Sequence, residues 1–318
     1  MKVEDIKNIC NLGTGTMGHG TAVMFAMAGY HVRMYGRSPE SIGRGLTGIK
    51  AALATYKLHG LVSEADIPQI LGRIKGVTTL EEAAEGADFV IESVAEEIEV
   101  KHRIFKALDK LCAPHTIFAT NTSGLSPTAI AEAIDRKDKF VVAHFWNPPH
   151  LVPLVEVVPG KYTAPETVDI TWKLMEKIGK KPVALKREAL GFIGNRLQLA
   201  LLREAMYLVE QGIATPEAVD TTVKYSLGRR LSTTGPLESA DLGGLDIFYN
   251  ISEYLLPDLC NDPGVPAILR EAKQQGNLGT KTGKGLFDWT DPEKLSKIKK
   301  TREDILLEWL QKDKTMDF

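Results

Sequence analysis

Four polar residues of this 318-residue chain carry side chains that could together transfer a proton: Ser123, His144, Glu156 and Asn195. A histidine at a strand end is a suitable general base, and a carboxylate can hold its second ring nitrogen. Hydroxyl and amide groups can polarise an oxygen at the reacting centre. Taken singly, each residue also has a structural interpretation: a core or surface histidine, a strand-end charge, a turn serine and a helix-capping asparagine. Their spacing alone leaves both interpretations open.

A glycine-rich segment near the start of the chain indicates what would lie beside such a group. An apolar run, Ile9–Leu12, leads into G-x-G-x-x-G, formed by Gly13, Gly15 and Gly18, and a helical pattern follows. The first glycine permits a tight turn, the second lets the backbone approach phosphates, and the third lets the helix pack closely on the strand. The helix N-terminus, at Thr16 and Met17, offers free N–H groups and a partial positive charge. This order predicts a dinucleotide-binding loop.

The choice between the two nicotinamide dinucleotides depends on the end of the second strand-like run, His31–Tyr35. An acidic residue there would bind the ribose 2′-hydroxyl, but the chain continues as Gly36-Arg37-Ser38. The missing carboxylate removes repulsion against a 2′-phosphate, and Arg37 could pair with that phosphate, which favours NADP. The alternative is that Arg37 is solvated and NAD binds with less help.

Composition limits the other function classes. Hydrophobic residues make up 43% and charged residues 25% of the chain, which is ordinary for a globular protein. The net charge of -2 gives no reason to expect nucleic acid or an anionic membrane as a partner. Cys10, Cys112 and Cys260 lack disulfide or metal-ligand spacing, so no metal is expected. The acidic start is unlike a signal peptide and no apolar run approaches a membrane span, so a cytoplasmic location is expected.

The pattern of elements changes along the chain. Strand-like runs at Ala87–Val94, Thr116–Asn121 and Phe140–His144 alternate with helical segments, which predicts a Rossmann-type, doubly wound α/β sheet. Beyond Gly191 the pattern is helical throughout. We therefore expect a dinucleotide-binding domain over residues 1–188 and an all-α substrate and dimerisation domain over residues 189–318. The apolar helices exceed what one small bundle needs, which favours a homodimer.

Five motifs in one order now identify a resemblance. G-x-G-x-M-G, N-T-S, H-F-x-N-P, L-V-E-V and G-F-x-x-N-R occur as in the L-3-hydroxyacyl-CoA dehydrogenase family. The resemblance extends over almost the whole chain, including Gly235–Glu238 and Lys281–Phe287. It implies an NAD(P)-dependent oxidoreductase of fatty acid metabolism, with NAD as the usual cofactor. The implied reaction is hydride transfer between the nicotinamide and the 3-hydroxy or 3-keto carbon of a short-chain acyl-CoA.

The resemblance also implies a role for individual residues. His144 would take the hydroxyl proton of the substrate, Glu156 would hold the far imidazole nitrogen, and Ser123 and Asn195 would donate to the reacting oxygen. Because Asn195 begins the helical domain, closure of the two domains would complete the site. Further residues matching the family are expected at the cofactor, namely Glu96, Lys101 and Asn121, and one at the substrate, Asn147. For Glu96 and Lys101 the alternative is a plain helix ion pair.

Several departures from the acyl-CoA pattern concern the substrate. Gly124 replaces a second serine after N-T-S, the segment Pro149–Pro153 differs, and Tyr225–Arg230 replaces an uncharged turn. These features are similar to the branch of the family acting on small free acids such as L-gulonate, carnitine and a pyridine-carboxylate alcohol. Arg230 could clamp a substrate carboxylate, unless Arg229 and Arg230 both face solvent. A crystallin-like or sensor protein without turnover is the non-enzyme alternative.

Overall fold

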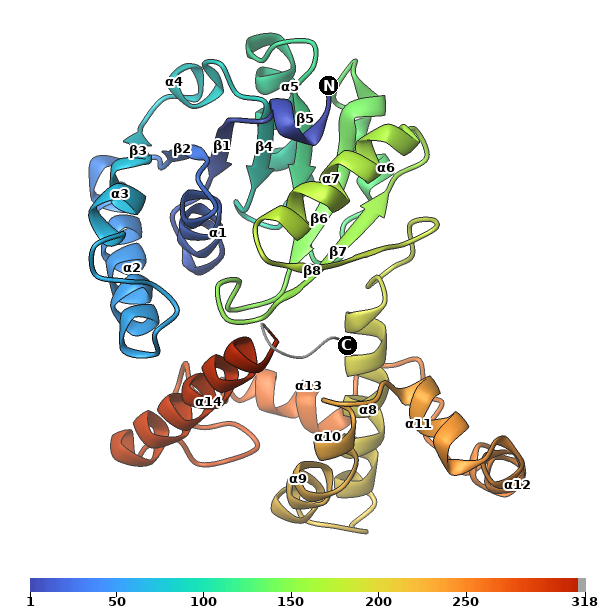
Figure 1. Cartoon of the computed structure of the whole chain (residues 1–318). Helices are drawn as coiled ribbons and strands as arrows, with labels where there is room; N and C mark the ends of the chain where they lie inside the picture. The colour runs from blue at the N-terminus through green and yellow to red at the C-terminus, as the bar shows by residue number, and fades with distance from the viewer. Residues whose placement is uncertain (314–318) are drawn as a thin grey trace. The chain divides into compact units, whose positions relative to one another are not determined.

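The structure, a computed structural model, describes residues 1–313 and divides the chain into two compact units (Figure 1). Unit 1 comprises Met1–Asn195 together with the chain from Thr301 onwards, and unit 2 comprises Arg196–Lys300. The sequence predicts a boundary after residue 188. The contacts instead group residues 189–195 and the last part of the chain with the first unit.

Unit 1 is built on an eight-stranded sheet of order β3-β2-β1-β4-β5-β6-β7-β8. Neighbouring strands are parallel except β6 and β7, which are antiparallel. The chain passes to opposite sides of β1, to β2 and later to β4, so the topological switch point lies between β1 and β4. The strands are β1 Asn8–Leu12, β2 His31–Tyr35, β3 Ile74–Val77, β4 Phe89–Glu92, β5 Ile117–Thr120, β6 Phe140–Phe145, β7 Leu154–Pro159 and β8 Lys181–Ala184.

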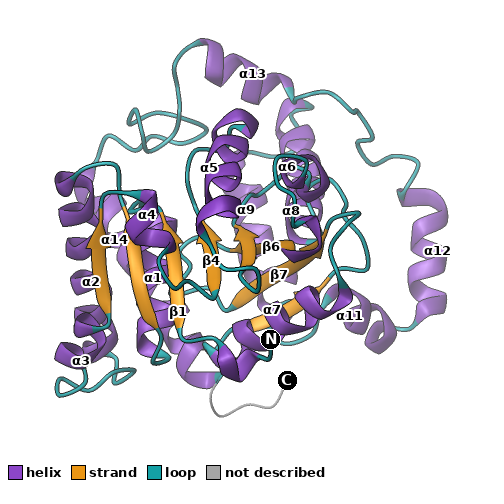
Figure 2. Ribbon diagram, turned by 90° about the horizontal axis from the view of Figure 1, so that it is seen from above, coloured by secondary structure: helices purple, strands orange, loops and turns teal. Residues whose placement is uncertain are grey.

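Helices cover both faces of this sheet, as the doubly wound prediction requires (Figure 2). Buried side chains of α1, α2 and α7 pack in one core, and those of α4, α5 and α6 pack in a second core. The helices of this part are α1 Thr16–Met27, α2 Pro39–Leu58, α3 Ile67–Gly72, α4 Leu80–Ala84, α5 Ile98–Leu111, α6 Pro127–Ala131 and α7 Pro165–Lys177, with 3-10 turns at Val3–Asp5 and Lys137–Lys139.

Local sequence accounts for most of these elements. Strands β4, β5 and β6 are buried along their whole length, which explains their almost continuous apolar runs. Several helices begin with a side-chain cap; Ser38, Thr79 and Ser126 each accept a hydrogen bond from the backbone N–H three residues on. Strand β3, with the sequence I-K-G-V, was not predicted, because a lysine and a glycine interrupt its short apolar run.

Unit 2 is helical, as predicted, and all of its residues are described. No strand occurs in residues 196–300, where the pairing is limited to two isolated bridges, Gly279↔Lys284 and Lys284↔Asp288. Across the described residues, no helix combines the length and apolar character that crossing a membrane demands. The helices lying wholly or partly in this unit are α8 Gly194–Glu210, α9 Pro216–Tyr225, α10 Leu227–Arg230, α11 Pro236–Gly243, α12 Leu245–Leu255, α13 Ala267–Gln274 and α14 Pro292–Lys312.

Two buried side chains, Tyr56 and Lys180, donate hydrogen bonds to the backbone of the loop that joins β6 to β7. Lys180, only 3% exposed, donates from its ammonium to the carbonyl oxygens of Val152, at 3.0 Å, and Pro149. The Tyr56 hydroxyl donates to the carbonyl oxygen of His150. Burial lowers the pKa of Lys180 to about 7. Because this loop connects the strands that carry His144 and Glu156, its anchoring also fixes the ends of those strands.

Candidate active site

His144 and Glu156 form a buried cross-strand pair. The antiparallel register of β6 and β7 places the two residues directly opposite each other. Glu156 Oε2 lies 2.8 Å from His144 Nδ1, and the residues are 1% and 5% exposed. A carboxylate at this nitrogen fixes the imidazole tautomer that leaves Nε2 free to accept a proton. The predicted base and its carboxylate partner are thus brought together.

Glu156 also accepts hydrogen bonds from three other groups. Its Oε1 accepts from the backbone N–H groups of Ile193, at 2.8 Å, and Gly194, at 3.0 Å, while Trp146 Nε1 donates to Oε2 at 3.3 Å. Burial raises the pKa of the Glu156 carboxyl, but His144 and the two backbone amides outweigh burial and lower it overall. Glu156 is therefore an anion at neutral pH and can stabilise an imidazolium at His144.

Ser123 and Asn195 complete the cluster. Ser123 Oγ lies 3.2 Å from His144 Nε2, on the side of the ring opposite Glu156. Asn195, at the start of α8, donates from Nδ2 to the backbone carbonyl oxygen of Ser123 at 3.0 Å. The four residues singled out from the sequence therefore form one connected group. The contact of Asn195 with the Ser123 backbone was not foreseen.

Two aromatic side chains that the sequence analysis did not single out enclose His144. The Phe192 ring meets the imidazole edge to face at 5.4 Å between centroids, and the Trp146 ring lies at 6.0 Å. Phe192 has a φ of 53°, which a non-glycine residue rarely adopts. A Cβ at Gly194 would lie 2.2 Å from the Trp146 indole, so only glycine fits there. The position of Trp146 within H-F-W-N-P, two residues after His144, is the feature of the sequence that could have pointed to its place beside the imidazole.

The glycine loop has the form that a dinucleotide requires. Gly13 has a φ of 119°, and a Cβ at Gly18 would lie 2.2 Å from the Gly13 carbonyl oxygen. The Asn11 side-chain amide stabilises this turn by donating to the carbonyl oxygens of Gly13 and Gly18. A Cβ at Gly15, by contrast, would meet nothing within 4 Å. Gly15 is also the N-cap of α1 and provides no capping side chain, so the first N–H groups of α1, at Thr16 and Met17, are available to a pyrophosphate.

Gly36, directly after β2, lies close to side chains of the neighbouring segments. A Cβ there would lie 2.5 Å from Ser41 Oγ and 2.9 Å from a Thr14 methyl carbon, so a larger residue at this position would require these side chains to move. Ser38 serves as the N-cap of α2, and Arg37 is exposed between them. Arg37 thus lies at the carboxyl end of β2, where the adenosine ribose binds in Rossmann folds.

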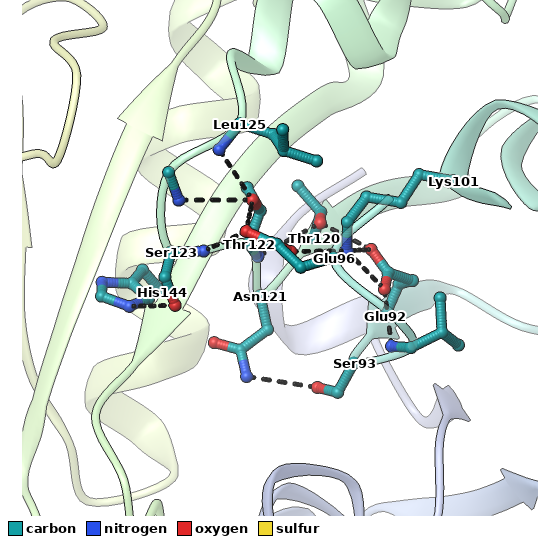
Figure 3. A network of polar contacts seen from close by, with 12 residues as sticks. Glu92, Ser93, Glu96, Lys101, Thr120, Asn121, Thr122, Ser123, Leu125 and His144 are labelled. Carbon is teal, nitrogen blue, oxygen red and sulfur yellow. Dashed lines mark hydrogen bonds and ion pairs between the residues drawn. The ribbon is translucent and has the colours of Figure 1, made fainter. Parts of the chain in front are cut away.

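The remaining predicted residues are divided between the two units. Asn121 donates to Ser93 Oγ at 3.2 Å and accepts from the Phe145 N–H at 2.7 Å, next to the glycine turn and the β6 end. Asn147 is exposed on the loop after β6. Arg230 lies on α10 in unit 2 and is exposed, and neighbouring Arg229 stacks on the Tyr225 ring. Glu96 and Lys101 belong to a polar network behind Ser123 (Figure 3).

Comparisons with known proteins agree with this geometry. The family model for the 3-hydroxyacyl-CoA dehydrogenase NAD binding domain matches residues 8–189, and that for the C-terminal domain matches residues 191–289. The chain is 40% identical over 288 residues to a probable 3-hydroxybutyryl-CoA dehydrogenase of Bacillus subtilis, covering 90% of this chain and 99% of the relative. It is 36% identical over 298 residues to 5-formyl-3-hydroxy-2-methylpyridine 4-carboxylate 5-dehydrogenase of Mesorhizobium japonicum, covering 93% and 95%.

A solved structure of a 5-formyl-3-hydroxy-2-methylpyridine 4-carboxylic acid 5-dehydrogenase, described as an NAD+ dependent dismutase, superposes with a TM-score of 0.91. It is 34% identical and covers 98% of this chain and 100% of that one. A two-domain dehydrogenase with a histidine–carboxylate pair is thus the class that fold and site define. The chain belongs to the 3-hydroxyacyl-CoA dehydrogenase family and is an NAD(P)-dependent dehydrogenase acting on a CH–OH group.

Substitution of the base tests this site. We expect His144→Gln to lower kcat roughly 10²- to 10⁴-fold, because a positioned general base contributes about that much. The Kd for the dinucleotide, measured by the quenching of nucleotide fluorescence, should change less than about threefold. His31→Gln, on the exposed start of β2, is the matched control and should leave both quantities unchanged. Full turnover in His144→Gln would disprove the assignment.

Proposed function

We propose that this enzyme transfers hydride between a nicotinamide cofactor and the 3-hydroxy or 3-keto carbon of a short-chain acyl-CoA. The observation that carries the proposal is the His144 imidazole, held at Nδ1 by Glu156 and with Nε2 directed to Ser123 Oγ. This arrangement suits an alcohol whose oxygen loses its proton to the imidazole as hydride departs from the carbon that bears that oxygen. A bound nicotinamide supplies the hydride acceptor, or the donor in the reverse direction.

The side chains of this chain supply the proton transfer and the orientation. In oxidation, His144 Nε2 accepts the proton of the substrate hydroxyl, and Glu156 stabilises the imidazolium that results. Ser123 Oγ, which is exposed and next to Nε2, can donate to the same substrate oxygen in the carbonyl direction. The Asn195 amide donates to the Ser123 backbone carbonyl oxygen and is proposed as a second donor to the substrate oxygen. Glu96 and Asn121 are proposed to line the nicotinamide side of the crevice, with Lys101 behind Glu96.

A small free hydroxy acid is the second candidate substrate. The relative with a pyridine carboxylate substrate in its name aligns with nearly the whole chain. Arg229 and Arg230 occupy a segment where a guanidinium could bind a substrate carboxylate bidentately, a contact that a thioester does not need. An acyl-CoA substrate would need basic groups for the 3′-phosphate of CoA. Lys50 and Lys57 lie on α2, but the Lys57 ammonium is already paired with Glu64 at 2.9 Å.

Steady-state kinetics separate these two substrates. We would compare kcat/KM for acetoacetyl-CoA with kcat/KM for free small 3-keto and 3-hydroxy acids. If the substrate is a free acid, Arg230→Met should lower its kcat/KM by roughly 10- to 100-fold, mainly through KM, because a charge-assisted hydrogen bond contributes about 1.5–3 kcal/mol. Arg302→Met, exposed on α14, is the control. A strong preference for the thioester that Arg230→Met does not alter would assign the CoA substrate and leave Arg230 without a role.

For the cofactor, we propose that NADP is accepted through Arg37. The support is the exposed Arg37 at the end of β2 and the glycine, in place of an acidic residue, at position 36. Arg37→Met should lower kcat/KM with NADP by roughly tenfold and leave that with NAD nearly unchanged, since only NADP carries the 2′-phosphate. Arg103→Met, exposed on α5, is the control. An unchanged ratio of the two efficiencies would assign NAD as the cofactor.

We further propose that the enzyme is a homodimer formed through unit 2. Large apolar side chains of α11 and α12 are strongly exposed, among them Leu237 at 82%, Leu242 at 78% and Tyr254 at 70%. An apolar surface of this kind is unfavourable in water and fits a second copy of the same face. Sedimentation equilibrium should therefore give twice the chain mass of 34.9 kDa. A monomer at micromolar concentration would refute this proposal.

A further inference from the structure

A buried polar network lies behind the active-site serine (Figure 3). Glu92, the last residue of β4, and Lys101, on α5, are 0% and 1% exposed. The Lys101 ammonium lies 2.8 and 2.9 Å from the two carboxylate oxygens of Glu92. The Thr120 hydroxyl donates to Oε2 at 2.6 Å, and the Val94 N–H donates to Oε1 at 2.7 Å. The Glu92 carboxylate is therefore fully satisfied and held rigidly at the strand end.

The network continues outward through a second carboxylate. Lys101 Nζ also lies 3.2 Å from Glu96 Oε2, and the Glu96 side chain is 46% exposed. The other oxygen, Oε1, accepts from the Ser123 N–H at 2.9 Å and from the Thr122 hydroxyl. One ammonium is thus shared by a buried and a half-exposed carboxylate, and the half-exposed one binds the backbone of Ser123.

Ser123 needs such support because of where it lies. It belongs to an irregular segment between the end of β5 at Thr120 and the start of α6 at Pro127, so no strand or helix ladder fixes its backbone. Its hydroxyl must nevertheless stay at hydrogen-bond distance from His144 Nε2. A misplacement of about 1 Å in such a group can cost on the order of 10²-fold in rate.

We propose that Glu92 and Thr120 are positioning residues for the dehydrogenase reaction. They hold Lys101 against Glu96, and Glu96 in turn holds the Ser123 amide, so that the Ser123 hydroxyl stays beside His144. Without the ammonium, Glu96 would lose the ion pair that holds its carboxylate beside the Ser123 backbone. Glu96 would then turn toward solvent and release Ser123. This inference rests on the proposed function of Ser123 and His144, and it assigns Lys101 to the support of Ser123.

The test removes the buried pair without leaving an unpaired charge. In Glu92→Met/Lys101→Met two long apolar side chains replace the ion pair, which avoids the severe destabilisation of deleting one partner. We expect the variant to fold, with kcat at saturating dinucleotide lowered roughly 10- to 100-fold, while the KM for substrate changes less than about threefold. Thr120→Val, which removes a single donor to Glu92, should give a smaller loss of kcat in the same direction.

The decisive measurement is the same substitution in a Ser123→Ala background. If the network acts through the Ser123 hydroxyl, Glu92→Met/Lys101→Met should lower kcat by less than about twofold once that hydroxyl is absent. If Glu92→Met/Lys101→Met still lowered kcat roughly 10- to 100-fold in the Ser123→Ala background, the inference would be overturned. A weakened dinucleotide Kd with unchanged kcat would also overturn it and assign the network to cofactor binding.

A second ion pair on the same helix provides the control. Asp109, nearer the end of α5, accepts from Arg136 Nε at 2.7 Å, and the two side chains are 8% and 20% exposed. Asp109→Leu/Arg136→Met should lower the melting temperature and leave kcat unchanged.

If Ser123→Ala and His144→Gln themselves retained full activity, the proposed active site would fail. If those two lost activity and the Glu92 and Lys101 variant did not, only the positioning role would fail.

Discussion

The contact between Glu156 and His144 is the interaction on which the rest of the site depends. One carboxylate accepts from the imidazole, the Trp146 indole and the backbone amides of Ile193 and Gly194. It therefore fixes the tautomer of the base and also the start of α8, the helix that leads into unit 2. Buried charges are tolerated only when their hydrogen-bonding capacity is filled, and here the donors that fill it come from the site itself.

The reversal of strand direction at β7 makes this contact possible. In a fully parallel sheet, a carboxylate beside the carboxyl end of β6 would have to come from the end of another strand. Because β7 runs antiparallel to β6, the early residue Glu156 lies opposite the late residue His144. The loop between the strands is short enough to be held by Lys180 and Tyr56. The antiparallel pair thus brings base and carboxylate to the edge of the sheet where the cofactor loop also lies.

Sequence patterns revealed those features that depend on local order along the chain. The glycine turn, the residues at the ends of β5 and β6, and the change from strand to helix patterns after Gly191 were all predictable. Contacts made across the sheet were not. Glu92 read as one more residue of a buried strand, and only the structure shows its ammonium partner on α5. The contact of the Asn195 amide with the Ser123 backbone likewise comes only from the structure, and the predicted role of Asn195 at the substrate oxygen stays a prediction.

The two buried carboxylates of unit 1 differ in a way that matches their proposed roles. Glu92 accepts hydrogen bonds from the Lys101 ammonium, the Thr120 hydroxyl and the Val94 N–H, so its carboxylate is held in one position. Glu156 instead faces the imidazole of His144, a side chain that can accept and release a proton at its other ring nitrogen. The Trp146 indole and the amides of Ile193 and Gly194 donate to the remaining acceptor positions of Glu156, and the two amides help to lower the pKa of its carboxyl. In the proposed mechanism the proton moves on and off His144, while the contacts among Glu92, Lys101 and Glu96 hold the backbone of Ser123.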